Sequence, residues 1–179
     1  MVRKLLRKLG VGRACYLMLD PHIRRRRKVL KGTPAAVLPP EQWETIDLLV
    51  CARTIKPDIR HIWDVGACTG VWSTVARSLF AHARIDAFEP QQRVQQQLRD
   101  TLSALGNCTV HHCALGEADG ESIFYETSQP DCSSLLKPQA GVGHDTGVTE
   151  VRIQKRAASS IIARGKRRCR TCSSWMCFL

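Results

Sequence analysis

The residues whose types and spacing could carry chemistry lie in the stretch 61–70, His-Ile-Trp-Asp-Val-Gly-Ala-Cys-Thr-Gly. An apolar strand is expected to end at Asp64, followed by a glycine-bearing turn and a helix that begins after Gly70. Glycines in such a turn let a ligand approach the backbone, and a helix N-terminus offers unpaired N–H groups and a positive dipole end. Glu89 follows 19 residues after Gly70, at the end of the next apolar run. Because a carboxylate there can accept hydrogen bonds from two ribose hydroxyls, the pattern predicts a nucleoside cofactor site.

The turn also discriminates between nucleosides. Dinucleotide binders favour G-x-G-x-x-G, in which the middle glycine admits a pyrophosphate. Here the pattern is Gly66-x-Cys68-x-Gly70, so Cys68 would obstruct that approach, and Asp64 would repel the phosphates. A carboxylate suits the ammonium of a methionine moiety instead. S-adenosylmethionine carries that ammonium and a sulfonium but no phosphate, so the charges favour it over NAD.

Alternating elements must position these residues. Apolar periodicity predicts strands near 59–65, 84–88 and 109–115, with helices near 71–80 and 91–105 between them. This alternation is typical of an α/β fold with a doubly wound, mostly parallel sheet.

Further elements flank this core. An earlier helix is expected to open at Pro39-Pro40, with one apolar side formed by Trp43, Ile46, Leu49, Val50 and Ile55. After the core, Asp119-Gly120 predicts a turn into a hairpin-like pair at 122–126, and alternation over 149–153 predicts another half-buried strand.

The basic charge of the chain lies at its ends. Residues 1–31 hold 11 Lys or Arg and one acid, residues 32–150 hold 8 basic and 15 acidic residues, and residues 151–179 hold 8 basic residues and no acid. The middle therefore offers no basic face for a nucleic acid, and no nucleic-acid partner is predicted. The N-terminal segment, a short apolar stripe followed by Arg24–Lys28, is interpreted either as a solvated leader or as a weak membrane-surface contact.

Nine cysteines accompany no secretory signal and no apolar stretch of membrane-span length. Reduced thiols in a cytoplasmic protein are therefore predicted. Cys169-x-x-Cys172 with Cys177 lacks a fourth ligand for zinc, and Cys68, Cys113 and Cys132 have no metal-site spacing, so no metal site is predicted.

Four short motifs occur in the same order and at similar spacing as in a known family. These motifs, Asp-Val-Gly-Ala-Cys-Thr-Gly (64–70), Phe88-Glu89-Pro90, Ala114-Leu115-Gly116 and Ser133-Ser134-Leu135, resemble the FkbM family of methyltransferases. The resemblance covers roughly residues 59–153. It implies a Rossmann-like class I methyltransferase fold, S-adenosylmethionine as cofactor, and O-methylation of a hydroxyl on a sugar or secondary metabolite.

The resemblance also implies roles for individual residues. Asp64, Gly66 and Gly70 would line the methionine side of the cofactor, Glu89 would take the ribose, and the adenine would lie beside Cys113, Ala114 and Leu115. The expected cofactor-binding residues also include Ala67, Cys68, Thr69 and Pro90. One departure is Cys68, where the family usually has Asn. No residue identifies itself as a catalytic base.

The last residues differ from what precedes them. Residues 166–179 contain no acid and no periodicity, and Trp175-Met176-Cys177 can only be encoded as TGG-ATG-TGY. Read two bases on, this stretch encodes Asp-Val, and permitted codons turn 170–177 into Asp-Leu-Leu-Lys-Leu-Asp-Val, which resembles the family's fourth strand. The sequence therefore predicts a basic N-terminal segment (1–33), a partial methyltransferase domain (34–165) and an aberrant, Cys-rich tail (166–179). If the tail supplies no fourth strand, the first strand has an unpaired edge and the chain is expected to fold poorly.

The function predicted from the sequence is an S-adenosylmethionine-dependent methyltransferase acting on a small-molecule or glycan acceptor, inactive if the domain is truncated. Two alternatives stay open: an NAD(P)-dependent Rossmann oxidoreductase, and a non-catalytic remnant or membrane-surface adaptor. The existence of a fourth parallel strand after residue 156 separates the enzyme from the remnant.

Overall fold

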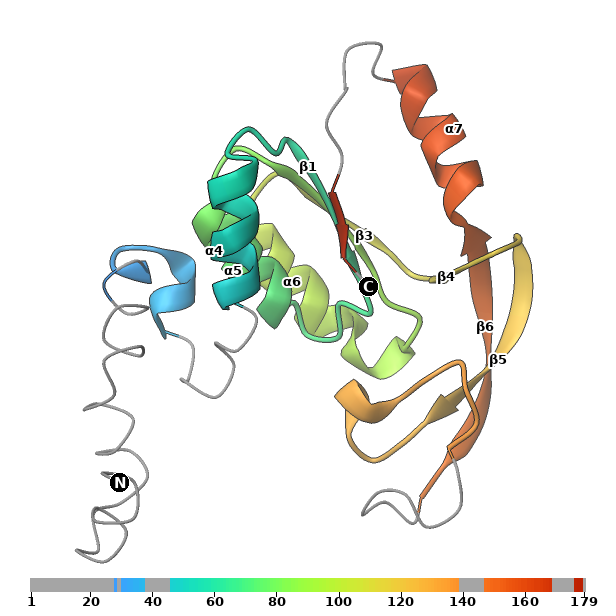
Figure 1. Cartoon of the computed structure of the whole chain (residues 1–179). Coiled ribbons are helices and arrows are strands. Elements are labelled where there is room, and N and C mark those ends of the chain that lie inside the picture. The colour runs from blue at the N-terminus through green and yellow to red at the C-terminus, as the bar shows by residue number, and fades with distance from the viewer. Residues whose placement is uncertain (1–27, 29, 38–45, 139–146, 169–175, 179) are drawn as a thin grey trace, which may run out of the picture.

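The computed structural model describes residues 28, 30–37, 46–138, 147–168 and 176–178. Its main sheet consists of β1 (His61–Val65), β2 (Arg84–Phe88), β3 (Cys108–His111) and β7 (Met176–Phe178), all parallel and in the order β3-β2-β1-β7 (Figure 1). Successive strands are added on one side of β1 and the last one on the other side. This reversal of strand order beside the first strand is the arrangement of Rossmann-like folds, so the α/β prediction is confirmed.

Helices cover both faces of this sheet. Helices α4 (Ile46–Ile55), α5 (Val71–Leu79) and α6 (Gln95–Leu105) pack on the face that carries Ile62, Ile85 and Ala87. The opposite face carries Trp63 and Phe88, and α7 (Ala158–Arg168) packs there through Ile161 and Ile162. The sheet is therefore doubly wound. Two short helices, η1 (Pro34–Val37) and η3 (Gln92–Val94), precede α4 and α6 respectively.

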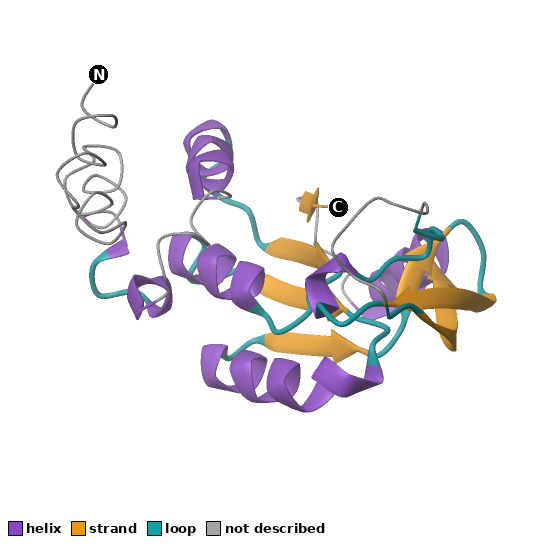
Figure 2. Cartoon of the chain, turned by 90° about the horizontal axis from the view of Figure 1, so that it is seen from below, coloured by secondary structure: helices purple, strands orange, loops and turns teal. Residues whose placement is uncertain are grey.

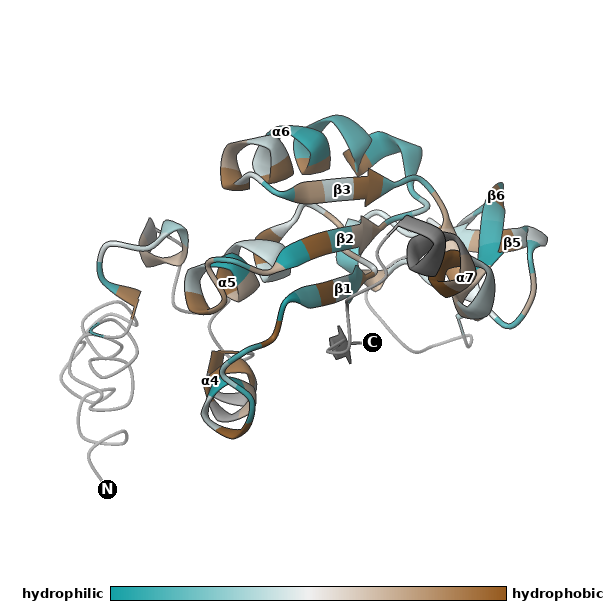
Figure 3. Cartoon of the chain, turned by 90° about the horizontal axis from the view of Figure 1, so that it is seen from above, coloured by the Kyte–Doolittle hydropathy of each residue, from teal (hydrophilic) through white to brown (hydrophobic). Residues whose placement is uncertain are grey.

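A second, smaller sheet lies beyond the carboxyl ends of the main strands (Figures 2 and 3). It consists of β4 (Ala114–Gly116), β5 (Gly120–Glu126) and β6 (Thr149–Ala157) in the order β4-β6-β5, with its own apolar contacts among Ala114, Phe124 and Ile153. The short helix η4 (Pro130–Cys132) follows β5. The small sheet thus stands at the edge of the main sheet where Rossmann-like proteins bind ligands.

Several predictions of local structure were wrong. The strand predicted over 109–115 is two strands in different sheets, because the pairing of β3 with β2 ends at His111 and β4 pairs with β6 instead. The hairpin predicted at Asp119-Gly120 does not form, because both β4 and β5 pair with β6 and the Asp119 carboxylate accepts a hydrogen bond from Ala157 N (2.6 Å).

The helix predicted from Pro39-Pro40 begins, among the described residues, at Ile46. Ile46 and Leu49 are fully buried as expected, but Ile55 is 84% exposed and does not belong to the apolar side. Trp43, Pro39 and Pro40 lie outside the described residues.

The tail supplies a strand. Residues 176–178 pair in parallel with β1, with Ile62 opposite Met176 and Asp64 opposite Phe178. The first strand was expected to have an unpaired edge if the tail could not form a strand. In the structure, three residues of the tail pair with this edge. The basic N-terminal segment through residue 27 and the Cys169-x-x-Cys172 pair lie outside the described residues.

Candidate nucleoside-binding site

The turn after β1 is held to the end of β2 by its own backbone. Gly66 N and Ala67 N both donate to Phe88 O (2.9 and 3.2 Å), and Gly70 N donates to Ala67 O (2.7 Å). Gly66 and Gly70 have φ of +78° and +83°, and a Cβ at Gly66 would meet no atom within 4 Å. These positive φ values favour glycine. There is open space beside the backbone at Gly66, whereas a Cβ at Gly70 would lie 2.8 Å from a methyl of Leu102. The turn is therefore open at Gly66, while the N–H groups of Gly66, Ala67 and Gly70 are already used within the chain.

The Glu89 carboxylate is bound on both of its oxygens. Oε2 accepts from Cys68 N (2.8 Å), Oε1 accepts from Gln91 N (2.8 Å), and the residue is 2% exposed. A carboxylate offers about four lone-pair positions, so two backbone bonds leave capacity for two hydroxyl donors. Because these bonds fix the orientation of Glu89 at the end of β2, the predicted ribose contact is placed beside the turn.

Asp64 is the second buried carboxylate of the site. Its Oδ2 accepts from Ser73 Oγ (2.5 Å) in the first turn of α5. Burial, assisted by the charge of Glu89 and opposed by hydrogen bonds from Ser73, raises the pKa of Asp64 to about 6. Within the part of the chain that the structure describes, neither carboxylate forms an ion pair. The contact ties Asp64 to the first turn of α5, whose N-cap is Gly70, but it leaves the negative charge without a counter-ion among the described residues.

Cys68 lies at the bend of the turn, where its N–H group donates to Glu89. Its φ of +47° is unusual for a residue with a side chain. Burial is the main cause that raises the pKa of its thiol, and the charge of Glu89 adds to this effect. Asp131 acts in the same direction and Arg93 in the opposite one. Both charged residues therefore lie close enough to the turn to change the pKa of Cys68.

Three residues that follow Glu89 also contact the candidate site and were not predicted from the sequence. Gln91 and Gln95 are 2% and 4% exposed, and Gln95 Nε2 donates to Glu89 O (2.6 Å) while its Oε1 is buried without a hydrogen-bond partner. Arg93 bridges Gln91 and Ser133. The only signal in the sequence was the run of polar residues directly after a buried strand, which also suits a solvated helix start.

The predicted adenine segment is placed near the same end of the sheet. His112 Nε2 lies 2.9 Å from Pro90 O, which ties this segment to the residue after Glu89. Cys113 packs with Trp63 and Phe88 on the α7 side, and burial raises the pKa of its thiol. Ala114 and Leu115 belong to β4. Ala67, Thr69 and Gly70 lie in the turn itself, and no described contact links Thr69 to Glu89.

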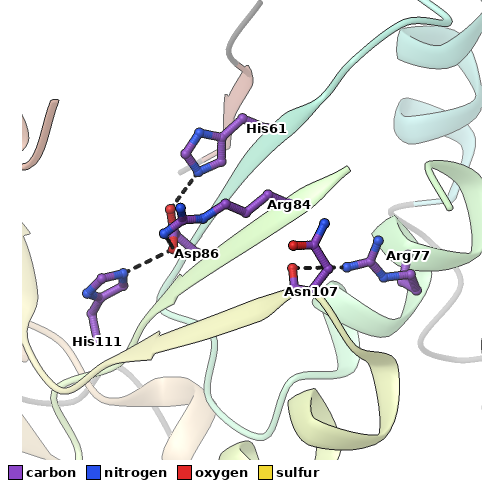
Figure 4. A network of polar contacts seen from close by, with 6 residues as sticks. All are labelled: His61, Arg77, Arg84, Asp86, Asn107 and His111. Carbon is purple, nitrogen blue, oxygen red and sulfur yellow. Dashed lines mark hydrogen bonds and ion pairs between the residues drawn. The ribbon is translucent and has the colours of Figure 1, made fainter. Parts of the chain in front are cut away.

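A polar cluster crosses the face of the main sheet opposite α5 (Figure 4). Asp86 lies in the middle of β2, and its carboxylate has three nitrogen partners: His61 Nε2 (2.5 Å), Arg84 Nη2 (2.9 Å) and His111 Nε2 (3.2 Å). Burial alone would raise the pKa of Asp86, but the hydrogen bonds from the two histidines and the arginine outweigh it and hold this pKa well below its ordinary range. The cluster joins three adjacent strands and does not include Asp64 or Glu89.

No three His, Cys, Asp or Glu side chains among the described residues gather in a way that could hold a metal ion. None of the described helices has the length and apolarity needed to cross a bilayer.

Comparison with known proteins gives little beyond the fold. No protein-family model matches the chain, and no curated protein matches it. Among solved structures, it is similar to a candidate RNA methyltransferase from Pyrococcus horikoshii, with 21% identity and a TM-score of 0.33 over 49% of this chain and 50% of that one. It is also similar to the methyltransferase FkbM from Methylobacillus flagellatus, with 15% identity and a TM-score of 0.38 over 78% of this chain and 39% of that one. The chain thus spans half or less of the length of these two proteins, and the likeness concerns the fold alone.

Proposed function

We propose that the chain binds S-adenosylmethionine and serves methyl transfer to a hydroxyl group. The observation that carries the proposal is the pair of buried carboxylates, Asp64 and Glu89, which flank an open glycine turn and have no counter-ion among the described residues. A ligand with a cationic end and a ribose satisfies both. The ammonium would offset the charge of Asp64, and the ribose hydroxyls would use the remaining acceptor positions of Glu89.

The turn geometry argues against a dinucleotide. A pyrophosphate needs free backbone N–H groups and a small residue at the bend. Here Gly66 N and Ala67 N donate to Phe88 O, Cys68 N donates to Glu89, and the bend carries a thiol side chain. Two nearby carboxylates would also repel the phosphates. We therefore place the oxidoreductase alternative second.

When bound, S-adenosylmethionine would supply an electrophilic methyl group for the acceptor oxygen, its sulfur would keep the electron pair of the C–S bond, and the hydroxyl proton would leave to water or a base. The chain contributes mainly alignment, which is the principal requirement of such a displacement. Asp64 and the turn would hold the methionine end, while Glu89 and its two backbone donors would fix the ribose. Resemblance to the FkbM family supports a sugar or secondary-metabolite hydroxyl as the acceptor.

Titration calorimetry on the full chain tests the proposal. We expect S-adenosylhomocysteine, the demethylated product, to bind more tightly than NAD. Replacing Glu89 by Gln removes the charge from both ribose contacts and should weaken binding about 100-fold, since a hydrogen bond to a charged group contributes about 1.5–3 kcal/mol. Glu117→Gln, on an exposed position, is the matched control. Tighter binding of NAD, or equal affinity of the Glu89 and Glu117 variants, would reject the proposed site.

Two further proposals follow from the sequence. A cytoplasmic location is supported by the nine cysteines, which would stay reduced there. Weak attraction to anionic membranes is supported by the basic charge of residues 1–31, and it should fade as salt rises. Equal sedimentation on anionic vesicles with and without residues 1–31 would reject the second proposal.

A further inference from the structure

The loop formed by residues 127–134 is closed on itself beside the candidate site. Ser134 is bridged to Tyr125 of β5 by two backbone hydrogen bonds (2.8 and 3.1 Å). Within the loop, Thr127 N donates to Ser133 Oγ (3.1 Å) and Thr127 Oγ1 donates to Gln129 O (2.7 Å). The loop is therefore a defined unit, and it is anchored at one end to the small sheet.

Gln91 provides the connection between this loop and the main sheet. Its side-chain Nε2 donates to Pro130 O (2.9 Å), while its backbone N donates to Glu89 Oε1 (2.8 Å). The residue is 2% exposed, its hydrogen bond to Glu89 is buried, and its hydrogen bond to Pro130 is partly buried. A single residue thus contacts the carboxylate of the nucleoside site and the backbone of the loop.

Arg93 fixes the orientation of the Gln91 amide. Arg93 Nε and Nη2 lie 3.2 and 2.9 Å from Gln91 Oε1, and Nη2 also donates to Ser133 Oγ (3.2 Å). Arginine can only donate, so the oxygen of the amide must face it and the NH₂ group must face Pro130. The loop is therefore held at two points, Pro130 and Ser133, through one amide group.

We propose that Gln91 is a positioning residue that couples ligand binding at Glu89 to the placement of the 127–134 loop, an inference that rests on the function proposed above. A ligand that binds the Glu89 carboxylate holds Oε1 in place, and Oε1 is the acceptor of the hydrogen bond from Gln91 N. The same residue then holds Pro130 and, through Arg93, Ser133. Because coupling between two sites is reciprocal, a loop released from Gln91 must weaken the ligand, and a bound ligand must stabilise the loop.

The test compares three variants of the full chain: Gln91→Leu, Gln91→Glu and the exposed control Gln97→Glu. S-adenosylhomocysteine affinity is measured by calorimetry, and backbone hydrogen exchange is followed in 66–70 and 127–134 with and without this ligand. In the wild type we expect the ligand to slow exchange in both segments. Gln91→Leu should bind about tenfold more weakly, equivalent to ~1.4 kcal/mol, and lose the ligand-dependent protection of 127–134 while keeping that of 66–70. A merely structural role would lower the melting temperature without separating the two segments.

Gln91→Glu keeps the acceptor for Arg93, replaces the donor to Pro130 by a carboxylate oxygen and adds a negative charge, which Gln97→Glu adds at an exposed position. It decides the question if the leucine variant does not unfold cooperatively. The control should match the wild type in both measurements. Wild-type affinity and loop protection in both Gln91 variants would overturn the inference while leaving the proposed function intact. No binding of S-adenosylhomocysteine by the wild type would overturn both.

Discussion

Replacing Arg77 by Met should destabilise the fold substantially, because its guanidinium joins three elements. From α5, Arg77 Nη1 donates to Ala81 O (2.8 Å) and Ala83 O (2.6 Å) before β2. Its Nη2 donates to Gly106 O (2.7 Å) and Asn107 O (3.3 Å) between α6 and β3, and Figure 4 shows the contact with Asn107. Arg77 is 7% exposed and has no carboxylate partner in the described part of the chain. It stabilises the fold by binding carbonyl groups rather than by an ion pair.

The magnitude follows from which carbonyls water can reach. Methionine retains the apolar stem of Arg77 but removes the guanidinium donor from all four oxygens. Asn107 O keeps a hydrogen bond from Ile85 N (3.1 Å), and Gly106 O keeps one from Cys108 Sγ (3.1 Å). Ala81, Gly106 and Asn107 are exposed residues, so water can replace the guanidinium there, whereas Ala83 is fully buried. The buried carbonyl of Ala83 loses its hydrogen bond without gaining water, and the other three can be solvated. Because the variant also no longer buries a charge, we expect its free energy of unfolding to fall by about 2–4 kcal/mol.

Urea unfolding of the full chain, followed by circular dichroism, measures this loss. Arg99→Met, on the exposed side of α6, is the control and should change the free energy of unfolding by less than about 0.5 kcal/mol. Arg77→Lys should fall between the two, because a single ammonium cannot span both pairs of carbonyls. If Arg77→Met unfolds at the same urea concentration as Arg99→Met, the four hydrogen bonds do not stabilise the fold as argued.

Five other substitutions have defined outcomes. Burial raises the pKa of Asp64 to about 6 from an ordinary 3.8. The stability that its protonated form provides at acid pH is therefore lost as the pH rises through 6, and Asp64→Asn should be about 1–3 kcal/mol more stable than the wild type at pH 8 and equal to it near pH 4 in urea titrations. Gly70→Ala should cost more than Gly66→Ala, about 2–4 against about 1–2 kcal/mol, since both glycines have positive φ but a Cβ at Gly70 would also meet a leucine methyl of α6 at 2.8 Å; equal losses would show that this contact yields freely. Asp86→Asn should destabilise the chain at pH 7, and this difference should shrink as the pH falls below 4, because a carboxylate with a depressed pKa stabilises the fold only while it is ionised; a pH-independent difference would contradict the ion cluster. Cys68→Asn should raise the melting temperature, because Asn tolerates the left-handed backbone found there, and an unchanged or lower value would show that the thiol side chain packs favourably.

The sequence predicted the part of the fold that depends on local signals. The boundaries of β1, α5 and β2 agree with the expected ones within two residues, because short apolar runs and the glycine turn mark them directly. The split of the strand predicted over 109–115 could not be seen in this way. It depends on the pairing of Leu115 with Arg156, a partner some forty positions further along the chain. Hydropathy patterns report which face a residue takes, not which strand lies beside it.

Local sequence signals likewise predicted some residues of the candidate site and missed others. Asp64, Glu89 and the glycine turn stood out because their residue types and order imply a chemistry. Gln91 and Arg93 did not, because their role depends on Pro130 and Ser133, which reach them only after β5 has folded back along β6. A glutamine after a strand has no distinctive signal until its amide partners are known.

The pairing of β7 with β1 also bears on the order in which the molecule assembles. Strand β2 pairs with β3 across a single helix, from Ile85 to Cys108, whereas Ile62 meets Met176 only after nearly the whole remaining chain has been synthesised. Loop-closure entropy makes the longer contact less favourable by on the order of 1–2 kcal/mol, and only three residues of backbone pairing offset it. The three-strand unit of β1 to β3 with its helices is therefore the early-folding part, and β7 docks last. The same difference makes β7 the first strand to detach, so the backbone amides that β1 shares with it should exchange with solvent through a local opening well before those between β1 and β2.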